Sequence, residues 1–373
     1  MKRRSAAVAL TLMLAGCPES NPQPPPVVPV ATSEVEPPPP RRTDPIAKPA
    51  RPARAVLAER GNEDGGWANM LFAGGRLFAL TEVNKWKGRM YVPASILWSV
   101  SDDGGPRARM IDLEGLATLA ADDAWLYVAV YRDLSTMNST PANVPTGRIF
   151  RMPLNGGPPV GLATSVAPHT LAVDGDTLYF DDWRMAKDGT RPPTPSGIKD
   201  AIRFAFDDKS VYFAVAKGAG RTSGQILQMP KTGGTPKVIA TGLPAEPGGL
   251  AVDGAHVYFT AISYSGKEAE TGGLVGRVPK EGGPVQALAE GQPALHDLWV
   301  SGEHVYFYSG RRGFPGTVLR VGKTGGGVET VTTDPTLEQV TVGPSAIYLA
   351  SDGTFDEGTK RRVTPAVLVR IAR

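Results

Sequence analysis

The sequence has only one cysteine in 373 residues, Cys17. Without a second cysteine the chain cannot form an internal disulfide, so an exported fold must be held by packing and backbone hydrogen bonds. Long apolar runs are missing as well. The apolar stretch at residues 5–14 is too short to span a bilayer as a stable helix.

Signatures of common enzyme chemistry are also absent. The sequence has no phosphate-binding glycine loop, no His-Glu-x-x-His pair, no Gly-x-Ser-x-Gly motif and no cysteine cluster. We therefore expect no cofactor. A surplus of positive charge is lacking too, because removal of Lys2, Arg3 and Arg4 with a leader leaves 37 basic and 37 acidic residues. The charge balance therefore gives no reason to expect a nucleic-acid partner.

What is present at the N-terminus predicts export. Lys2, Arg3 and Arg4 precede the short apolar stretch, which ends in Leu14-Ala15-Gly16-Cys17. These four residues resemble the lipobox of bacterial lipoproteins. The resemblance implies that residues 1–17 are a signal peptide, that cleavage occurs before Cys17, and that Cys17 carries lipid that holds the protein on a membrane. The alternative is an ordinary secretory peptide with a chance cysteine.

Residues 18–52 predict a disordered linker. Thirteen of these 35 residues are proline, a composition that builds no core and favours extended polyproline II. At ~3.1 Å per residue the segment could reach roughly 100 Å. Such a segment serves as a spacer behind a lipid anchor, or alternatively as a proline-rich ligand for a partner domain.

A hairpin pattern recurs along residues 53–373. An aromatic residue preceded by Leu, Val or Ile follows a turn seven times, at intervals of 33 to 52 residues. Two-residue turns that contain glycine suit tight hairpins, and strand repeats with a period near 45 residues are typical of β-propellers. The aligned aromatics are Phe78, Tyr127, Tyr179, Tyr212, Tyr258, Tyr306 and Tyr348.

A second hairpin with a Gly-Gly turn follows in the same repeats, as in ILQMPKTGGTPKVIA at 226–240. Each repeat then supplies the four antiparallel strands of one blade. The seventh repeat stops after its third strand, at 366–373, whereas ARAVLAERG at 53–61 resembles the fourth strand of the other repeats. The sequence therefore predicts an all-β fold, a seven-bladed β-propeller of four-stranded blades closed by an N-terminal strand that completes the last blade. We expect a monomer.

The segments GLAVDG-x-HVYFT and GxVxRVPKxGG carry a resemblance to known families. They are similar to the YWTD-type propeller repeats of lipoprotein-receptor ectodomains, and more closely to repeat lipoproteins of myxobacteria. The resemblance covers residues 53–373, although the tetrapeptide itself is degenerate in this chain. It implies a binding or scaffolding module, but a fold alone does not transfer a function.

The starts of the innermost strands hold the candidate catalytic residues. His169 and His296 occupy equivalent positions, and Glu338, Asp297 and Arg203 belong to the same ring at one mouth of the central channel. Imidazole and carboxylate groups in one place could hold a metal or perform acid–base chemistry. Streptogramin-inactivating lyases use a histidine-and-acid site on a seven-bladed propeller, but no motif aligns. Alternatively, these residues cap a water-filled channel, with Arg203 balancing Asp297.

Longer connections between second and third strands are expected on the same face, at 82–93, 131–147, 264–273, 310–316 and 352–365. Loops on a rigid scaffold often carry recognition, and aromatic and arginine side chains are enriched among interface anchors. The candidate binding residues are Trp86, Tyr91, Arg311, Arg312 and Phe314. Ordinary solvated loops are the alternative.

Together these features predict a lipid-anchored binding or scaffolding module of the bacterial cell envelope, whose partner is another envelope protein. It would face the periplasm or the cell surface, and the sequence does not distinguish the inner from the outer membrane. The alternative function is a propeller enzyme, a lyase or hydrolase with or without a metal, with its site at the channel mouth.

Overall fold

The computed structural model describes residues 54–60, 65–87, 90–131, 147–166, 168–217, 223–244, 246–262, 272–310, 316–354 and 362–373. The chain divides into two units, Met1–Ala50 and Arg51–Arg373. The predicted signal peptide, Cys17 and nearly all of the predicted linker fall in the first unit, which lies outside the described residues. Those assignments therefore stay predictions.

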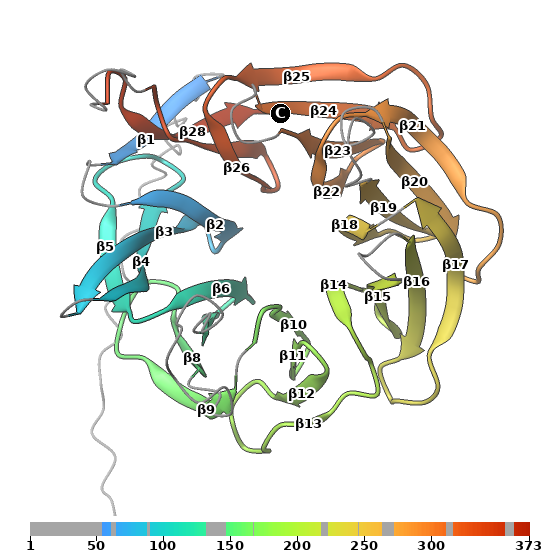
Figure 1. The fold of residues 1–373 in the computed structure, drawn as a ribbon, viewed down its shortest axis with the longest axis horizontal. Helices are drawn as coiled ribbons and strands as arrows, with labels where there is room; N and C mark the ends of the chain where they lie inside the picture. Colours follow the sequence, from blue (N-terminus) through green and yellow to red (C-terminus); the bar gives the residue numbers. More distant parts are fainter. Residues whose placement is uncertain are drawn as a thin grey trace, which may run out of the picture. The chain divides into compact units, whose positions relative to one another are not determined.

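The described chain forms seven four-stranded antiparallel sheets arranged as a ring (Figure 1). This is the predicted seven-bladed β-propeller, and we number the blades from the first complete sheet. The strands are, blade 1, β2 (Gly66–Ala73), β3 (Arg76–Lys87), β4 (Met90–Ser101) and β5 (Ala108–Leu113); blade 2, β6 (Leu116–Ala121), β7 (Trp125–Tyr131), β8 (Gly147–Pro153) and β9 (Val160–Val166); blade 3, β10 (Ala172–Asp174), β11 (Thr177–Phe180), β12 (Trp183–Ala186) and β13 (Thr194–Pro195); blade 4, β14 (Ala201–Phe206), β15 (Ser210–Lys217), β16 (Ser223–Pro230) and β17 (Lys237–Pro244); blade 5, β18 (Glu246–Val252), β19 (His256–Ile262), β20 (Gly273–Pro279) and β21 (Gln286–Gln292); blade 6, β22 (Leu295–Ser301), β23 (His304–Ser309), β24 (Gly316–Gly322) and β25 (Glu329–Asp334); blade 7, β26 (Leu337–Val342), β27 (Ala346–Ser351), β28 (Ala366–Ala372) and β1 (Arg54–Arg60).

The ring closes between the two ends of the propeller sequence. Strand β1 pairs antiparallel with β28, from Arg54 opposite Ile371 to Arg60 opposite Ala366, with one bulge after Val56. Blade 7 thus combines the first and the last strand of the propeller, as the sequence predicts. The closure is non-covalent and relies on the β1–β28 hydrogen bonds and on Leu57, which is buried between blades 7 and 1.

The core consists of seven apolar clusters, one between each pair of neighbouring blades. The seven aligned aromatics all lie on second strands and are all buried. Each packs against aliphatic residues of the next blade, as Tyr258 of β19 packs in one cluster with Val305 and Phe307 of β23. The recurring aromatic therefore fills the wedge between blades, which explains its presence in every repeat.

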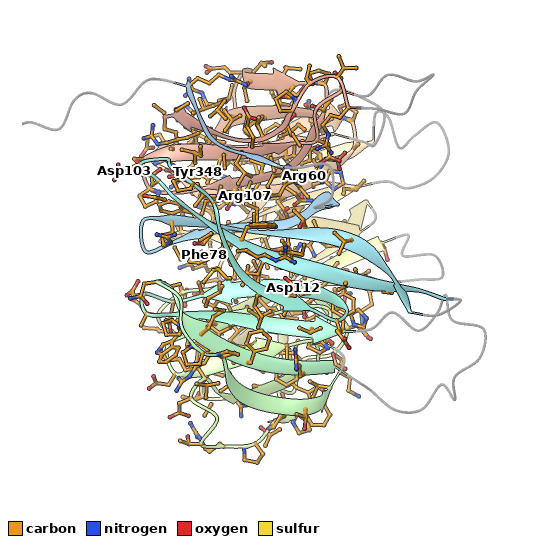
Figure 2. The ribbon with its side chains drawn as sticks, turned by 90° about the vertical axis from the view of Figure 1, so that its left-hand side faces the viewer. Arg60, Phe78, Asp103, Arg107, Asp112 and Tyr348 are labelled. Atoms are coloured by element: carbon orange, nitrogen blue, oxygen red, sulfur yellow. The ribbon has the colours of Figure 1, made fainter. Side chains whose placement is uncertain are left out.

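The two faces of the ring differ. We call the face that bears the first-to-second-strand turns the turn face, and the face at which the innermost strands begin the mouth face. Figure 2 shows Asp103 and Tyr348 toward the turn face and Arg60 toward the mouth face. Strand β1 runs from Arg54, opposite Ile371, to Arg60, so the propeller chain enters at the turn face.

A belt of ion pairs joins successive blades at the turn face. An aspartate at the end of one first strand or in the turn after it meets a lysine from the turn between the third and fourth strands of the next blade in four places: Asp122–Lys187 at 2.9 Å, Asp174–Lys231 at 2.6 Å, Asp207–Lys280 at 2.8 Å and Asp253–Lys323 at 2.9 Å. The lysine turn contains a Gly-Gly pair in three of these blades and a single glycine, Gly189, in blade 3. In three of these blades the buried tyrosine also donates its hydroxyl to the same aspartate. The belt therefore connects the turn residues to the core aromatics.

The lysine reaches its partner because the Gly-Gly turn that follows it is tight. Gly233 and Gly234 have φ of +94° and +133°, a region that residues with a side chain rarely adopt. The turn closes with a bond from the Gly233 N–H to the Pro230 carbonyl at 2.8 Å, which positions Lys231 beside Asp174. The repeated Gly-Gly pair thus has a structural role.

Two regions depart from the regular blade. Residues 82–93 were expected to form a loop, but β3 extends to Lys87 and β4 begins at Met90, paired throughout. The expectation of a loop was wrong because the strand register continues past Glu82 into a two-stranded ribbon. Blade 3 is compressed: Asp181-Asp182 alone connects β11 to β12, and β13 has two residues. Among the described elements, none is a helix of the length and apolarity needed to cross a membrane.

Candidate site at the mouth of the central channel

The innermost strands bring the predicted mouth residues to one face. Arg203 lies on β14, His296 and Asp297 on β22, and Glu338 on β26, while His169 lies just before β10. All five occupy the beginning of the innermost segment of their blades. Arg203 and Asp297 share the lining of one cavity, so the structure brings these two together, whereas the two histidines are not part of that lining.

His169 packs at the boundary between blades 2 and 3. Its imidazole lies 4.8 Å from the ring of Tyr131, at the end of β7, and 3.7 Å from the carboxylate of Asp181. The same carboxylate accepts hydrogen bonds from the backbone N–H groups of His169 and Thr170. The imidazole itself is 66 % exposed, so it is accessible to a ligand.

His296 is held within blade 6. Its Nε2 lies 2.7 Å from the carbonyl oxygen of Gly310, and its ring stacks on Tyr308 with centroids 5.4 Å apart. Its backbone carbonyl accepts a hydrogen bond from the Thr260 hydroxyl of blade 5 at 2.6 Å. One ring nitrogen is thus occupied by the protein, and the residue also connects two blades.

Arg203 and Asp297 form a loose pair across blade 5. The Arg203 Nε lies 3.8 Å from an Asp297 carboxylate oxygen, and both side chains are about half exposed. Arg203 also donates Nε to the Gly248 carbonyl at 2.7 Å and Nη1 to the Ile202 carbonyl at 2.8 Å. The predicted balance between Arg203 and Asp297 is therefore present in the structure, although at a distance typical of a weak ion pair.

Two glycines make this arrangement possible. A Cβ on Gly249 would lie 2.6 Å from the backbone nitrogen of Leu298, and one on Gly248 would lie 3.0 Å from the His296 carbonyl. Only residues without a side chain let β18 and β22 approach this closely. The close approach brings Arg203 of blade 4 within reach of Asp297 of blade 6.

The electrostatics of the mouth are negative between blades 6 and 7. Burial raises the pKa of Tyr308 to about 12, and the nearby carboxylates of Glu338, Asp297 and Asp334 add to the rise. Tyr308 therefore stays protonated and donates its hydroxyl to the Leu337 carbonyl at 2.8 Å. Within the described part of the chain, no three His, Cys, Asp or Glu side chains gather closely enough to hold a metal ion.

The predicted binding residues are only partly placed. Trp86 lies on β3 opposite Tyr91 on β4, in the paired ribbon that extends beyond blade 1. Arg311, Arg312 and Phe314 lie outside the described residues. Of the predicted longer connections, parts of 131–147, 264–273, 310–316 and 352–365 also lie outside the described residues. The binding assignment therefore stays a prediction.

The sequence analysis missed the partners of the mouth residues. Tyr131 and Tyr308 lie at or near the ends of second strands and pack against the two histidines. The available signal was a second aromatic residue shortly after the aligned one. Tyr131 follows Tyr127 by four positions, and Tyr308 follows Tyr306 by two. Asp181 could not be found this way, because only the two-residue turn of blade 3 brings it back to His169.

Comparison with known proteins gives the fold and no closer relationship. No family model and no curated protein match the sequence. The β-propeller domain of the trilobed protease from Pyrococcus furiosus, which has an open velcro topology, aligns with a TM-score of 0.53 and 9 % identity over 83 % of this chain and 93 % of that chain.

Two further solved structures align with the chain. Acylaminoacyl peptidase from Pyrococcus horikoshii gives a TM-score of 0.53 and 11 % identity over 82 % of this chain, which spans 50 % of the peptidase chain. A chain of a nidogen/laminin complex gives 0.45 and 14 % identity over 72 % of this chain and 91 % of that chain. At identities of 9 and 11 %, the two alignments with a TM-score of 0.53 show a shared fold alone and transfer no activity.

Proposed function

We propose that the protein is a lipid-anchored binding module of the bacterial cell envelope that captures another envelope protein on its mouth face. Lipid on Cys17 would hold the chain on a membrane, and residues 18–52 would act as the tether. The observation that carries the proposal is the register of β1: the propeller chain enters at the turn face, at Arg54 opposite Ile371. The mouth face is therefore the face that a tethered partner-binding module leaves free.

The β3–β4 ribbon supports the same orientation. It extends β3 and β4 to Lys87 and Met90, on the mouth side of the blade, with Trp86 paired with Tyr91 near its tip. Projecting strands and loops on a rigid ring suit recognition, because the scaffold positions them without ordering cost. We assign partner contact to Trp86, Tyr91, Arg311, Arg312 and Phe314.

Site-specific photo-crosslinking in the native envelope tests the proposal. A photoreactive residue at Trp86 should yield one discrete crosslinked species, whereas the same residue at Glu303, which is exposed on the turn face, should yield none. Combining Trp86→Ala, Arg311→Ala and Phe314→Ala should abolish capture, since interface anchors each contribute about 1–3 kcal/mol.

The same preparation separates this function from the alternative enzyme. The double variant His169→Ala and His296→Ala should keep the crosslink, because neither imidazole belongs to the ribbon or the loops. Loss of the crosslink in the histidine variant, with retention in the loop variant, would refute the assignment. Equal crosslinking from Trp86 and Glu303 would do the same.

A further inference from the structure

The central channel contains a cavity of about 630 Å³. Its walls come from the innermost strands of blades 1, 2, 4, 5, 6 and 7, together with Arg373 at the end of β28. The volume lies within the range of small-molecule sites, which is about 300–1,000 Å³. All of the lining residues belong to the described part of the chain, so the cavity does not depend on the loops that carry the proposed protein contact.

Three polar side chains in the lining have no partner among the described residues. The amides of Asn69 and Gln339 and the hydroxyl of Thr341 face no hydrogen-bonding group within reach. Asn69 and Gln339 are half buried, and the Thr341 hydroxyl is not among the fully buried side-chain atoms that lack a partner in the described part of the chain. All three groups are therefore accessible to water or to a ligand in the channel. Amides and hydroxyls both donate and accept hydrogen bonds, and so do the hydroxyl groups of a sugar.

The charges in the lining disfavour an ionic ligand. Its one carboxylate, Asp297, is paired with Arg203. Both guanidinium groups are held on backbone carbonyls, Arg203 on those of Gly248 and Ile202, and Arg373 on that of Pro344 at 2.5 Å. A carbonyl does not cancel the charge of a guanidinium, so the lining keeps two positive charges against one negative and disfavours a cation. A neutral ligand loses less hydration on entry than an anion does.

Apolar surface accompanies these polar groups. Leu71, Trp299 and Val342 line the cavity and are each only half buried, so they leave carbon surface toward the channel. A pyranose ring presents C–H groups on its faces and hydroxyls at its edge, which matches a lining of this kind. We propose that the central channel binds a neutral mono- or disaccharide, independently of the protein capture assigned to the mouth face.

Ligand-observed NMR and calorimetry on the full chain test this. The probes are glucose, N-acetylglucosamine, maltose and N,N′-diacetylchitobiose, with citrate and glycine betaine as charged comparisons. We expect at least one sugar to bind. The combined variant Asn69→Leu and Gln339→Leu should weaken that sugar at least tenfold, and Thr341→Val should weaken it by a smaller factor, because each removes a hydrogen bond without opening a cavity.

Thr118→Val is the matched control, because Thr118 holds the position equivalent to Asn69 in blade 2 and is not part of the lining. It should leave sugar binding unchanged, and equal melting temperatures will show that every variant is folded. The proposal is overturned if no sugar binds at 10 mM, on the order of the weakest useful affinity. Unchanged binding by the Asn69/Gln339 variant, or tighter binding of citrate or betaine than of any sugar, overturns it too.

Discussion

Lys280 and Asp207 illustrate how single residues join neighbouring blades. Their ion pair, 2.8 Å long, joins blade 5 to blade 4, and three further boundaries have the same pair. We call the positions that Asp207 and Lys280 occupy in their repeats the aspartate position and the lysine position. At the boundary between blades 1 and 2 these positions hold Ala73 and Leu154, which pack in one apolar cluster. The two positions therefore change together along this chain, as contacting positions should.

The boundary between blades 7 and 1 is also joined by an ion pair, but here the aspartate comes from blade 1 and the cation from strand β28 of blade 7. Asp102 occupies the lysine position of blade 1, and it accepts hydrogen bonds from Arg370 at 3.1 Å and from the Tyr348 hydroxyl at 2.5 Å. A blade that carries an aspartate in the aspartate position, as blades 2 to 5 do, would bring that aspartate next to the like charge of Asp102. The reversed charges thus favour closure of blade 7 on blade 1 over closure on any other blade.

A double-mutant cycle tests this pairing rule. Ala73→Asp and Leu154→Lys should each destabilise the protein by about 1–3 kcal/mol, because each places a charge beside an apolar partner. Combined, they should recreate the pair and recover a measurable part of that loss, with a coupling free energy of about 0.5–3 kcal/mol. Urea unfolding measures all four proteins. Simple additivity of the two losses would show that the positions do not interact.

The same aspartates make stability depend on pH. Burial alone would raise the pKa of Asp207, but the Lys280 ammonium and the backbone N–H groups of Lys209 and Ser210 outweigh it and hold the pKa well below its usual range. A lowered pKa adds stability above the unfolded value of about 4, and this stability is lost as the pH falls through the folded pKa.

Asp207→Asn should therefore lower the free energy of unfolding by about 1–2 kcal/mol at pH 7, and the difference from the parent should narrow toward pH 3. Unfolding midpoints in urea across this range measure it. Asp208→Asn is the control, since Asp208 is an exposed neighbour without an ion partner in the described structure, and it should change little at either pH. A parent–variant gap that is constant across the range would count against the pair.

At the scale of elements, closure depends on a strand far from its partner in sequence. Strand β1 supplies the outer edge of blade 7, and its Leu57 belongs to the cluster that joins blades 7 and 1. A ring whose seven interfaces resemble one another is only as stable as its closing contact, because opening one boundary exposes apolar surface on two blades.

Deleting residues 54–60 should consequently lower the melting temperature of the whole propeller by many degrees and expose apolar surface to a hydrophobic dye. Deleting residues 20–50 should leave the melting temperature nearly unchanged, because that segment lies outside the propeller unit. Differential scanning calorimetry of the two deletions and the parent makes the comparison. Similar effects of the two deletions would contradict a structural role for β1.

The sequence predicted the elements well where the repeat was regular. The seven aligned aromatics marked the second strands, and the glycine turns marked the hairpins. The seventh repeat lacks a fourth strand at the C-terminus, which pointed to β1 as the closing strand. The ribbon of β3 and β4 escaped prediction because residues 82–93 mix charged, polar and apolar residues around Gly88 without a clear alternation, although β3 and β4 pair in continuous register.

The site was harder to predict than the fold. Position in the repeat placed Arg203 and Asp297 at the channel, because equivalent positions in a ring face the same way. It could not show that His296 is engaged by the Gly310 carbonyl or that His169 packs on Tyr131. Such contacts join different parts of the chain, and their geometry follows from how the blades pack.

At the scale of the whole molecule, the proposed lipid anchor can be tested at Cys17. Cys17→Ser should block lipid attachment and leave either an uncleaved precursor or a released soluble protein, since the thiol is the predicted acceptor. Metabolic labelling with fatty acid and fractionation of membranes measure this, with the parent chain as reference. Equal labelling and equal membrane association of parent and variant would refute the lipid anchor.

The antiparallel pairing of β1 with β28 also determines how the domain would respond to mechanical force. A pull on the chain at Arg54, resisted at the mouth face, acts along the axis of β1 and away from Arg60. The hydrogen bonds to β28 lie across that axis, so they would be sheared together and would not open one after another. The geometry that closes the ring is therefore also the one in which the strand best resists being drawn out from its N-terminal end.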